Sequence, residues 1–215
     1  MNREKLQNYV GNGERAQPTF SAREMQRRQD AVRGVMREMK LDAALFTSYH
    51  NICYLSDFLF CYFGRRYGLI VDHNKATSVS AGIDGGQPWR RTYGSKNITY
   101  TDWEKDNYFH ALRGLTKGVK RLGIEFDHIN LDTMALLKAE FPDMEFLDIA
   151  QPSMRLRMVK SDEEIAHITR MTRIADWAVR PVVTQARLGY PSMKLPCIPP
   201  PQWFVKLPRP GHMAN

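Results

Sequence analysis

The sequence has few cysteines and no long hydrophobic run, and both absences narrow the class of protein. The 215 residues include three cysteines, Cys53, Cys61 and Cys197, with no C-x-x-C pair among them. This usage predicts a reduced, cytoplasmic setting and not a disulfide framework. No stretch approaches the roughly 18 to 20 apolar residues that a membrane helix needs, so no membrane partner is expected. The first eighteen residues are polar and contain no secretory apolar region.

Sequence motifs for metal, phosphate and nucleophile sites are also missing. None of the six histidines belongs to an H-E-x-x-H pattern, and no Cys or His residues are spaced as zinc ligands. The glycines at 82–86 lack the Lys-Ser/Thr pair of a phosphate-binding loop, and neither Ser48 nor Ser56 lies in a nucleophile-elbow pattern. The residues therefore predict no metal and no cofactor.

The positive charge is unevenly distributed along the chain. The formal net charge is +8, but residues 180–215 carry five basic and no acidic side chains. Residues 1–179 retain 26 basic and 23 acidic side chains, a net charge of only +3. The folded part therefore lacks the basic stripe typical of nucleic-acid-binding domains, and no nucleic-acid partner is expected.

Hydrophobic spacing predicts alternating helices and strands. Ser21 and Glu24 form a capping box before a helix that reaches about Lys40. Further helices are expected over 49–56, 106–118 and 132–140, and strands over 43–47, 67–71, 76–80, 98–101, 123–126 and 145–148. The runs 67–71 and 76–80 flank an Asp-His-Asn-Lys turn and predict a hairpin. The pattern indicates an α/β fold with a mixed sheet flanked by helices.

The chain divides into four predicted segments. A flexible arm over 1–18 precedes an α/β domain over 19–150. A connector begins at Gln151 and leads to a second capping box, Ser161 with Glu164, which opens one more helix before about 180. Eight of the twelve prolines follow Arg180, so residues 181–215 are expected to be irregular.

Glu125, Asp127 and His128 lie together after a predicted strand, where α/β folds often bind ligands. Side chains alternate between the two faces of a strand, so a run this short is expected to send them in different directions. This alternation argues against a catalytic cluster.

The segment 46–67 is the richest in aromatic and polar side chains. Phe63, Gly64 and Arg65 place a ring and a guanidinium next to each other, followed by Arg66 and Tyr67. An arginine of this kind binds a small carboxylate through two hydrogen bonds, and a neighbouring ring excludes water from the pair. The alternative is a packed aromatic corner with a surface arginine.

Several strings in the sequence resemble the creatinase family, the creatine amidinohydrolases. They are FTSYHN, YLSDFLF, FGR, IDGGQPWRRT, YTDWEKDNYF and GIEFDHINL, followed by MRLRMVKSDEEIAHI near a domain crossing. The similarity extends over about residues 18–179. The resemblance implies a ribonuclease-H-like N-terminal domain followed by a larger "pita-bread" catalytic domain, in an enzyme that hydrolyses creatine to sarcosine and urea without a metal.

The resemblance also implies a homodimer in which the N-terminal domain of one subunit completes the site of its partner. By local motif, Phe63 and Arg65 are the substrate-contacting residues: Arg65 would bind the creatine carboxylate and Phe63 would close the apolar side of the pocket. In the family, a histidine and glutamates of the second domain carry out the chemistry.

The similarity stops at the first helix of the second domain, and residues 181–215 contain no counterpart of the catalytic histidine and glutamates. We therefore expect a truncated creatinase-like subunit that contacts substrate and dimerises but is inactive alone. Two alternatives stay open: a non-enzymatic assembly or regulatory module, and a fragment of a metal-dependent proline-peptidase relative.

Overall fold

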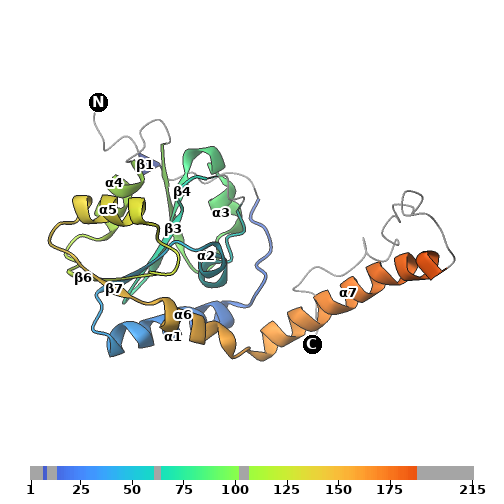
Figure 1. Cartoon of the computed structure of the whole chain (residues 1–215). Coiled ribbons are helices and arrows are strands. Elements are labelled where there is room, and N and C mark those ends of the chain that lie inside the picture. The colour runs from blue at the N-terminus through green and yellow to red at the C-terminus, as the bar shows by residue number, and fades with distance from the viewer. Residues whose placement is uncertain (1–6, 9–13, 61–63, 102–106, 188–215) are drawn as a thin grey trace. The chain divides into compact units, whose positions relative to one another are not determined.

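The computed structural model describes residues 7–8, 14–60, 64–101 and 107–187 (Figure 1). The chain divides into two units, Met1–Met158 and Val159–Asn215. The strands are β1 (Gln7–Asn8), β2 (Ala43–Phe46), β3 (Gly68–Asp72), β4 (Ala76–Ala81), β5 (Lys96–Tyr100), β6 (Arg121–Ile124) and β7 (Glu145–Asp148). The helices are α1 (Ala22–Glu38), α2 (Tyr49–Ser56), the 3-10 helix η2 (Gly82–Asp84), α3 (Gln87–Arg91), α4 (Asn107–Leu115), α5 (Leu131–Glu140), α6 (Ala150–Met158) and α7 (Asp162–Arg187).

The strands of the first unit form one mixed sheet in the order β1-β5-β4-β3-β2-β6-β7. The hairpin β3–β4 is antiparallel, as predicted, with Gly68 opposite Val79. Strand β3 is also antiparallel to β2, whereas β2, β6 and β7 are parallel neighbours. The five strands β4-β3-β2-β6-β7 thus have the 3-2-1-4-5 order, with one antiparallel member, of the expected ribonuclease-H-like fold.

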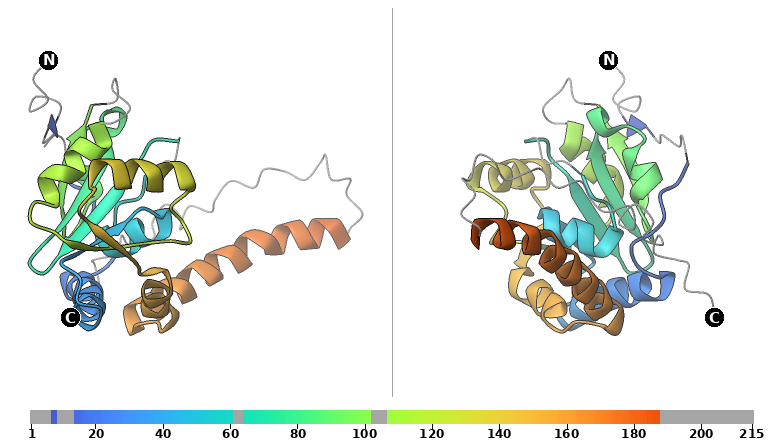
Figure 2. Two further views of the ribbon diagram at one scale, coloured as in Figure 1. Left: turned by 60° about the vertical axis from the view of Figure 1, so that its left-hand side comes forward. Right: turned by 90° about the vertical axis from the view of Figure 1, so that its right-hand side faces the viewer.

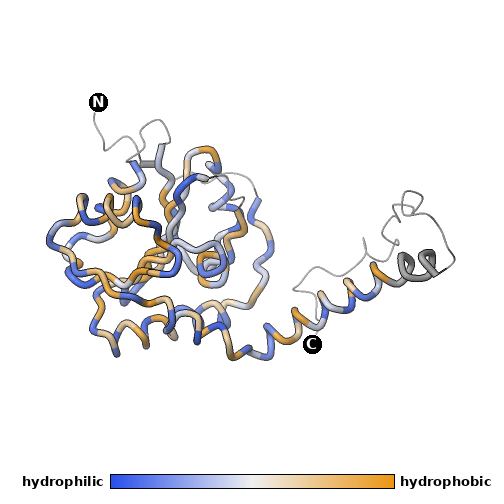
Figure 3. The backbone as a smooth tube through the Cα atoms, viewed as in Figure 1, coloured by the Kyte–Doolittle hydropathy of each residue, from blue (hydrophilic) through white to orange (hydrophobic). Residues whose placement is uncertain are grey.

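Helices cover both faces of this sheet (Figures 1 and 2). Helices α1, α2 and α6 pack together on one face, and α4 and α5 pack together on the other. Hydrophobic residues gather on the central strands, and every residue of β2 is buried (Figure 3). The predicted mixed sheet with flanking helices is confirmed.

The serine half of the first predicted capping box forms at the start of α1. Ser21 Oγ accepts a hydrogen bond of 3.2 Å from the backbone N–H of Glu24. The Glu24 carboxylate itself binds two arginines, Arg27 and Arg28, on the next turn. Arg28 is buried between two aromatic rings, with its guanidinium carbon 3.8 Å from the ring centroid of Phe20 and 4.3 Å from that of Tyr54.

The arm predicted over 1–18 is held to the domain at two described places. Gln7 and Asn8 pair with β5 as strand β1. The backbone N–H of Ala16 donates to Arg90 O at 2.7 Å, and Arg90 Nε donates to Glu14 O at 3.0 Å. These contacts fasten residues 14–16 to α3.

The connector predicted from Gln151 is instead helix α6, so this prediction was wrong. The carboxylate of Asp148 accepts a hydrogen bond from the backbone N–H of Ala150 at 2.9 Å and caps the first turn. Pro152 lies in that first turn, where no N–H donor is required of it. Proline there starts a helix and does not break one.

The second unit is described by helix α7. Its predicted capping box is confirmed in both directions: Ser161 N donates to Glu164 Oε2 at 2.8 Å, and Glu164 N donates to Ser161 Oγ at 3.3 Å. The helix continues through Pro181 to Arg187, past the expected end near 180. The remainder of the predicted irregular tail, 188–215, lies outside the described residues.

Within the part of the chain that the structure describes, no helix has both the length and the hydropathy needed to cross a membrane.

Candidate functional site

The carboxyl ends of the parallel neighbours β2 and β6 bring two separate polar segments together. Thr47 and Ser48 follow β2, and Glu125 follows β6. The side chain of Glu125 is 1% exposed. One of its oxygens accepts hydrogen bonds from the backbone N–H groups of Thr47 at 2.5 Å and Ser48 at 2.8 Å. The other accepts from Ser48 Oγ and from Asn51 Nδ2, each at 2.5 Å.

This buried carboxylate fixes the position of α2. Ser48 is the N-cap of the helix, and its hydroxyl accepts a hydrogen bond from the backbone N–H of Asn51 at 3.4 Å while it donates to Glu125. A negative charge at this end also interacts favourably with the helix dipole. Glu125 is therefore an anchor between β6 and α2, and its four hydrogen bonds go to groups that hold this corner together.

Glu125, Asp127 and His128 diverge, as expected, but not through strand alternation, because β6 ends at Ile124 and residues 126–128 form a turn. Glu125 is buried, whereas Asp127 and His128 are exposed. His128 Nδ1 lies 2.9 Å from the hydroxyl of Thr47, so the ring is held beside the residue that Glu125 positions. The three residues therefore form no shared catalytic cluster.

A surface hollow of about 70 Å³ lies next to this anchor and contains the predicted Arg65. The exposed Arg65 lies on its wall. The residues that line the hollow are Thr47, Arg65, Arg66, Tyr67, Tyr108, His128, Ile129, Asn130 and Thr133. Two elements far apart in sequence, the chain before β3 and the chain after β6, thus meet around one concavity.

The residue after Arg65 is held in place by several contacts. Arg66 donates to the carboxylate of Asp132 at 3.1 Å, and its guanidinium carbon lies 5.3 Å from the ring centroid of Phe109. Its backbone carbonyl accepts a hydrogen bond of 2.9 Å from the hydroxyl of Tyr100. Arg66 is therefore part of the frame, whereas its neighbour Arg65 lies exposed at the hollow.

Two tyrosines form the floor beside the arginines. The hydroxyl of Tyr67 donates to the carboxylate of Asp84, and the hydroxyl of Tyr108 donates to the backbone carbonyl of Tyr67 at 3.2 Å. Burial raises the pKa of Tyr108, which keeps its phenol protonated. The floor is consequently neutral, and the positive charge at the hollow comes from the arginines.

The other predicted contact residue, Phe63, lies outside the described residues, which resume at Gly64. The aromatic corner next to it is present. Phe60 stacks on Tyr67 with ring centroids 4.2 Å apart and on Phe58 with centroids 5.2 Å apart. The sequence analysis offered two alternatives for this segment, a packed aromatic corner and an arginine beside a cleft. The structure contains both features.

The other candidate groups that the structure describes, namely metal-ligating clusters, Cys53 and His50, provide no reactive centre. Among the described residues, no group of three or more His, Cys, Asp or Glu side chains is arranged to hold a metal ion. Burial raises the pKa of the Cys53 thiol to about 11, which suppresses the nucleophilic thiolate. Burial, together with the positive charge of Arg157, lowers the pKa of His50.

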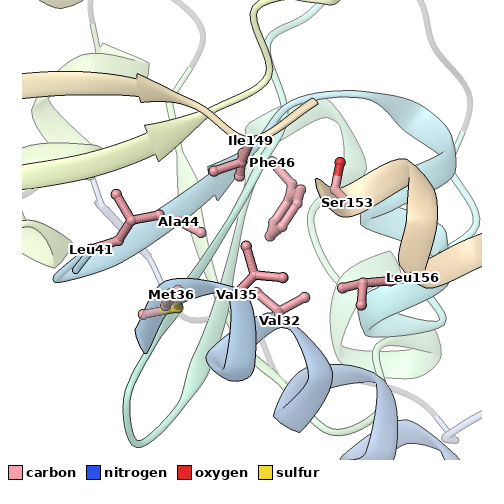
Figure 4. Close-up of a pocket in the computed structure, with 9 residues that line it drawn as sticks. All are labelled: Val32, Val35, Met36, Leu41, Ala44, Phe46, Ile149, Ser153 and Leu156. Atoms are coloured by element: carbon pink, nitrogen blue, oxygen red, sulfur yellow. The ribbon is translucent and has the colours of Figure 1, made fainter. Parts of the chain in front are cut away.

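A further cavity, drawn in Figure 4, is a void in the core and not a binding site. It measures about 10 Å³, roughly the space of one water molecule. Its wall is formed by apolar side chains of α1, β2 and α6 with one hydroxyl, that of Ser153 (Figure 4). Such a void marks where helix α6 meets the core.

Comparison with known proteins identifies the family to which the domain belongs. The family model described as the Creatinase/Prolidase N-terminal domain matches residues 28–159. The creatinase of Bacillus sp. (strain B-0618) is 44% identical over 189 residues, covering 85% of this chain and 45% of that protein. The uncharacterized peptidase YqhT of Bacillus subtilis (strain 168) is 26% identical over 165 residues, covering 74% of this chain and 44% of that protein. The chain thus spans less than half the length of these curated relatives.

Solved structures share the fold at lower identity. The prolidase from Pyrococcus horikoshii OT3 superposes with a TM-score of 0.61 at 21% identity, over 74% of this chain and 42% of that one. The Xaa-Pro dipeptidase from Bacillus anthracis gives a TM-score of 0.63 at 19% identity, over 74% of this chain and 43% of that one. At such identities the likeness concerns the fold alone.

Proposed function

The chain belongs to the creatinase/prolidase N-terminal domain family, and from this premise we propose that it is the substrate-contacting domain of a creatinase-like hydrolase. The proposed reaction is the hydrolysis of creatine to sarcosine and urea. The 44% identity to a Bacillus creatinase, against 26% to a Bacillus peptidase, supports creatine over a dipeptide as the substrate.

The single structural observation that carries the proposal is the position of Arg65 on the wall of the hollow. A guanidinium there can present two parallel N–H groups to a carboxylate, the geometry that makes such pairs strong and specific. Creatine offers one carboxylate on a short, flexible body. In the proposal, Arg65 binds this group and Phe63 covers the apolar side of the substrate.

The groups next to Arg65 are engaged within the domain or uncharged. Arg66 is engaged with Asp132 and Phe109, so its charge is partly compensated within the domain. Tyr108 is neutral and contributes its ring and not a competing charge. The anchor formed by Glu125 holds Thr47 and, through it, His128 at the opposite wall.

The hydrolytic step would be carried out elsewhere. The family resemblance assigns proton transfer to a histidine, and guanidinium binding to glutamates, of a second domain that lies beyond the matched region. We propose that the hollow faces the catalytic domain of a partner subunit in a homodimer, and that the chain alone releases no urea from creatine.

A chimaera tests the proposal directly. Residues 1–179 of this chain replace the matching part of the Bacillus creatinase, and urea release from creatine is measured. We expect turnover, and we expect R65A to lower kcat/KM at least tenfold, because a lost charge-assisted pair costs about 2–5 kcal/mol when it is desolvated. The control R37A removes an exposed arginine near the end of α1 and should leave the kinetics unchanged.

The outcome also separates the alternatives. Hydrolysis of an Xaa-Pro dipeptide in the presence of Mn²⁺, without creatine turnover, would favour the peptidase assignment. Creatine turnover equal in R65A and R37A would remove Arg65 from the site. For an assembly module, the chain mixed with intact creatinase should change its activity, and no change would exclude that role.

A further inference from the structure

A second hollow, of about 410 Å³, borders strand β5. It is lined by Lys96, the first residue of β5, and by Trp89 of α3. The strand register places Lys96 level with Thr77 of β4, Ile70 of β3 and Leu45 of β2. The first hollow lies where β2 and β6 end and β3 begins, so the two hollows border different strands, with β4 between β5 and β3.

The volume of this hollow falls in the range of small-molecule sites, which measure about 300–1,000 Å³. One wall is apolar and consists of Trp89 and the buried Pro88. An aromatic wall of this kind supplies a large contact area at little cost in conformational entropy. The space and the wall suit a molecule with a small apolar body.

The charge around the hollow is positive. Arg15 lies with its guanidinium carbon 5.0 Å from the ring centroid of Trp89 and donates a hydrogen bond of 2.6 Å to the backbone carbonyl of Thr92. A guanidinium has five N–H donors, so this single bond leaves others for a ligand. Lys96 is exposed, and none of the described residues that line the hollow is acidic.

Two hydroxyl groups beside the hollow have no hydrogen-bond partner. Thr92 is 3% exposed, and within the described residues neither its Oγ1 nor the buried Oγ of Ser95 meets a donor or an acceptor. An unpaired buried polar group costs about 1–3 kcal/mol. Both residues line the hollow, so a side-chain rotation would bring these hydroxyls to the oxygen atoms of a bound ligand.

We propose that this hollow binds a small organic anion, whose carboxylate or phosphate contacts Arg15 and Lys96 while its apolar body packs on Trp89. The site is independent of the proposed creatine site, because the two hollows share no lining residue and border different strands of the sheet.

Calorimetric titration of the full chain tests this site with four probes: benzoate, phenyl phosphate, acetate and inorganic phosphate. We expect binding of at least one aromatic probe, tighter than its counterpart without a ring, and weakened by added salt because the contacts are ionic. The comparison of benzoate with phenyl phosphate distinguishes a carboxylate from a phosphate ligand.

Variants locate the binding. K96A and R15A should each weaken the bound probe at least fivefold, and T92V should weaken it without loss of thermal stability, because it removes an unpaired hydroxyl. K96A keeps the contacts of residues 14–16 with α3, so it remains informative if R15A loosens that segment. The matched control K138A removes an exposed lysine of α5. This helix packs with α4, on the face of the sheet opposite α1 and α2.

Equal affinity in K96A, R15A and K138A would overturn the proposal, as would the absence of binding by all four probes. Aromatic and ring-free probes of equal affinity would remove the role of Trp89.

Discussion

The Oε1 atom of Glu125 accepts a hydrogen bond of 2.5 Å from the hydroxyl of Ser48, a residue 77 positions earlier in the chain. This contact joins the end of β6 to the first turn of α2. The carboxylate accepts hydrogen bonds from four donors and is 1% exposed. The wall of the Arg65 hollow that Thr47 and His128 form therefore depends on a residue that does not line the hollow.

Removal of this carboxylate should destabilise the domain strongly. E125A leaves buried donors of Thr47, Ser48 and Asn51 without an acceptor, and we expect a loss of about 3–5 kcal/mol in the free energy of unfolding. E125Q keeps the shape but turns an NH₂ group toward one set of donors, for a loss of about 1–3 kcal/mol. Denaturant titration followed by circular dichroism measures both.

The neighbouring acid is the control for this prediction. D127N changes an exposed carboxylate two residues away and should alter stability by less than about 0.5 kcal/mol. If E125A unfolded within 1 kcal/mol of the unsubstituted chain, the anchor role of Glu125 would be wrong.

Local signals in the sequence were sufficient for most of the fold. Both serine N-caps form where the Ser-x-x-Glu spacing predicts them, and the second capping box is complete, because the interactions involve residues three positions apart. The hairpin β3–β4 follows from its turn residues for the same reason. Helix α6 was missed, and its residues were assigned to a connector, because its start depends on the side chain of Asp148.

The site was harder to predict because its contacts are distant in sequence. The motif around Arg65 pointed to one wall of the hollow, but nothing local indicates that Thr47 and His128 form the other. Ser48 was considered only as a nucleophile and Glu125 only as part of a cluster, whereas the two bind each other. The sequence signal that could have predicted this contact is topological. Ser48 and Glu125 each follow a predicted strand, and the carboxyl ends of two strands that pair in parallel lie side by side.

Gly123 and Gly34 should respond in opposite ways to replacement by alanine. A Cβ at Gly123 in β6 would lie 2.7 Å from Ile149 Cγ2 and 2.8 Å from Leu41 Cδ1, so G123A should cost about 1–3 kcal/mol through overpacking. At Gly34 in α1 the nearest atom is the flexible Arg37 Nη2 at 3.9 Å, and G34A should gain about 0.5–1 kcal/mol. Thermal melts of the two variants provide the test, and a stabilising G123A would contradict the packing of Ile149 and Leu41 against β6.

The ion pairs of Glu24 should make stability depend on pH in the acid range. Hydrogen bonds from Arg27, with a smaller contribution from Arg28, lower the pKa of this carboxyl from 4.5 to about 2, although burial opposes the shift. The folded state therefore binds the proton more weakly than the unfolded state. The stabilisation is complete above pH 4.5 and is lost as the pH falls toward 2.

E24Q tests this dependence. The variant should be less stable than the unsubstituted chain at pH 7 by about 2–3 kcal/mol, and the difference should shrink as the pH falls from 4.5 toward 2. D30N is the matched control, since Asp30 on the same helix also pairs with an arginine three positions later but is mostly exposed. Its effect should stay below about 1 kcal/mol. A difference between E24Q and the unsubstituted chain that persisted unchanged at pH 2 would show that packing, and not the charge of Glu24, stabilises this corner of α1.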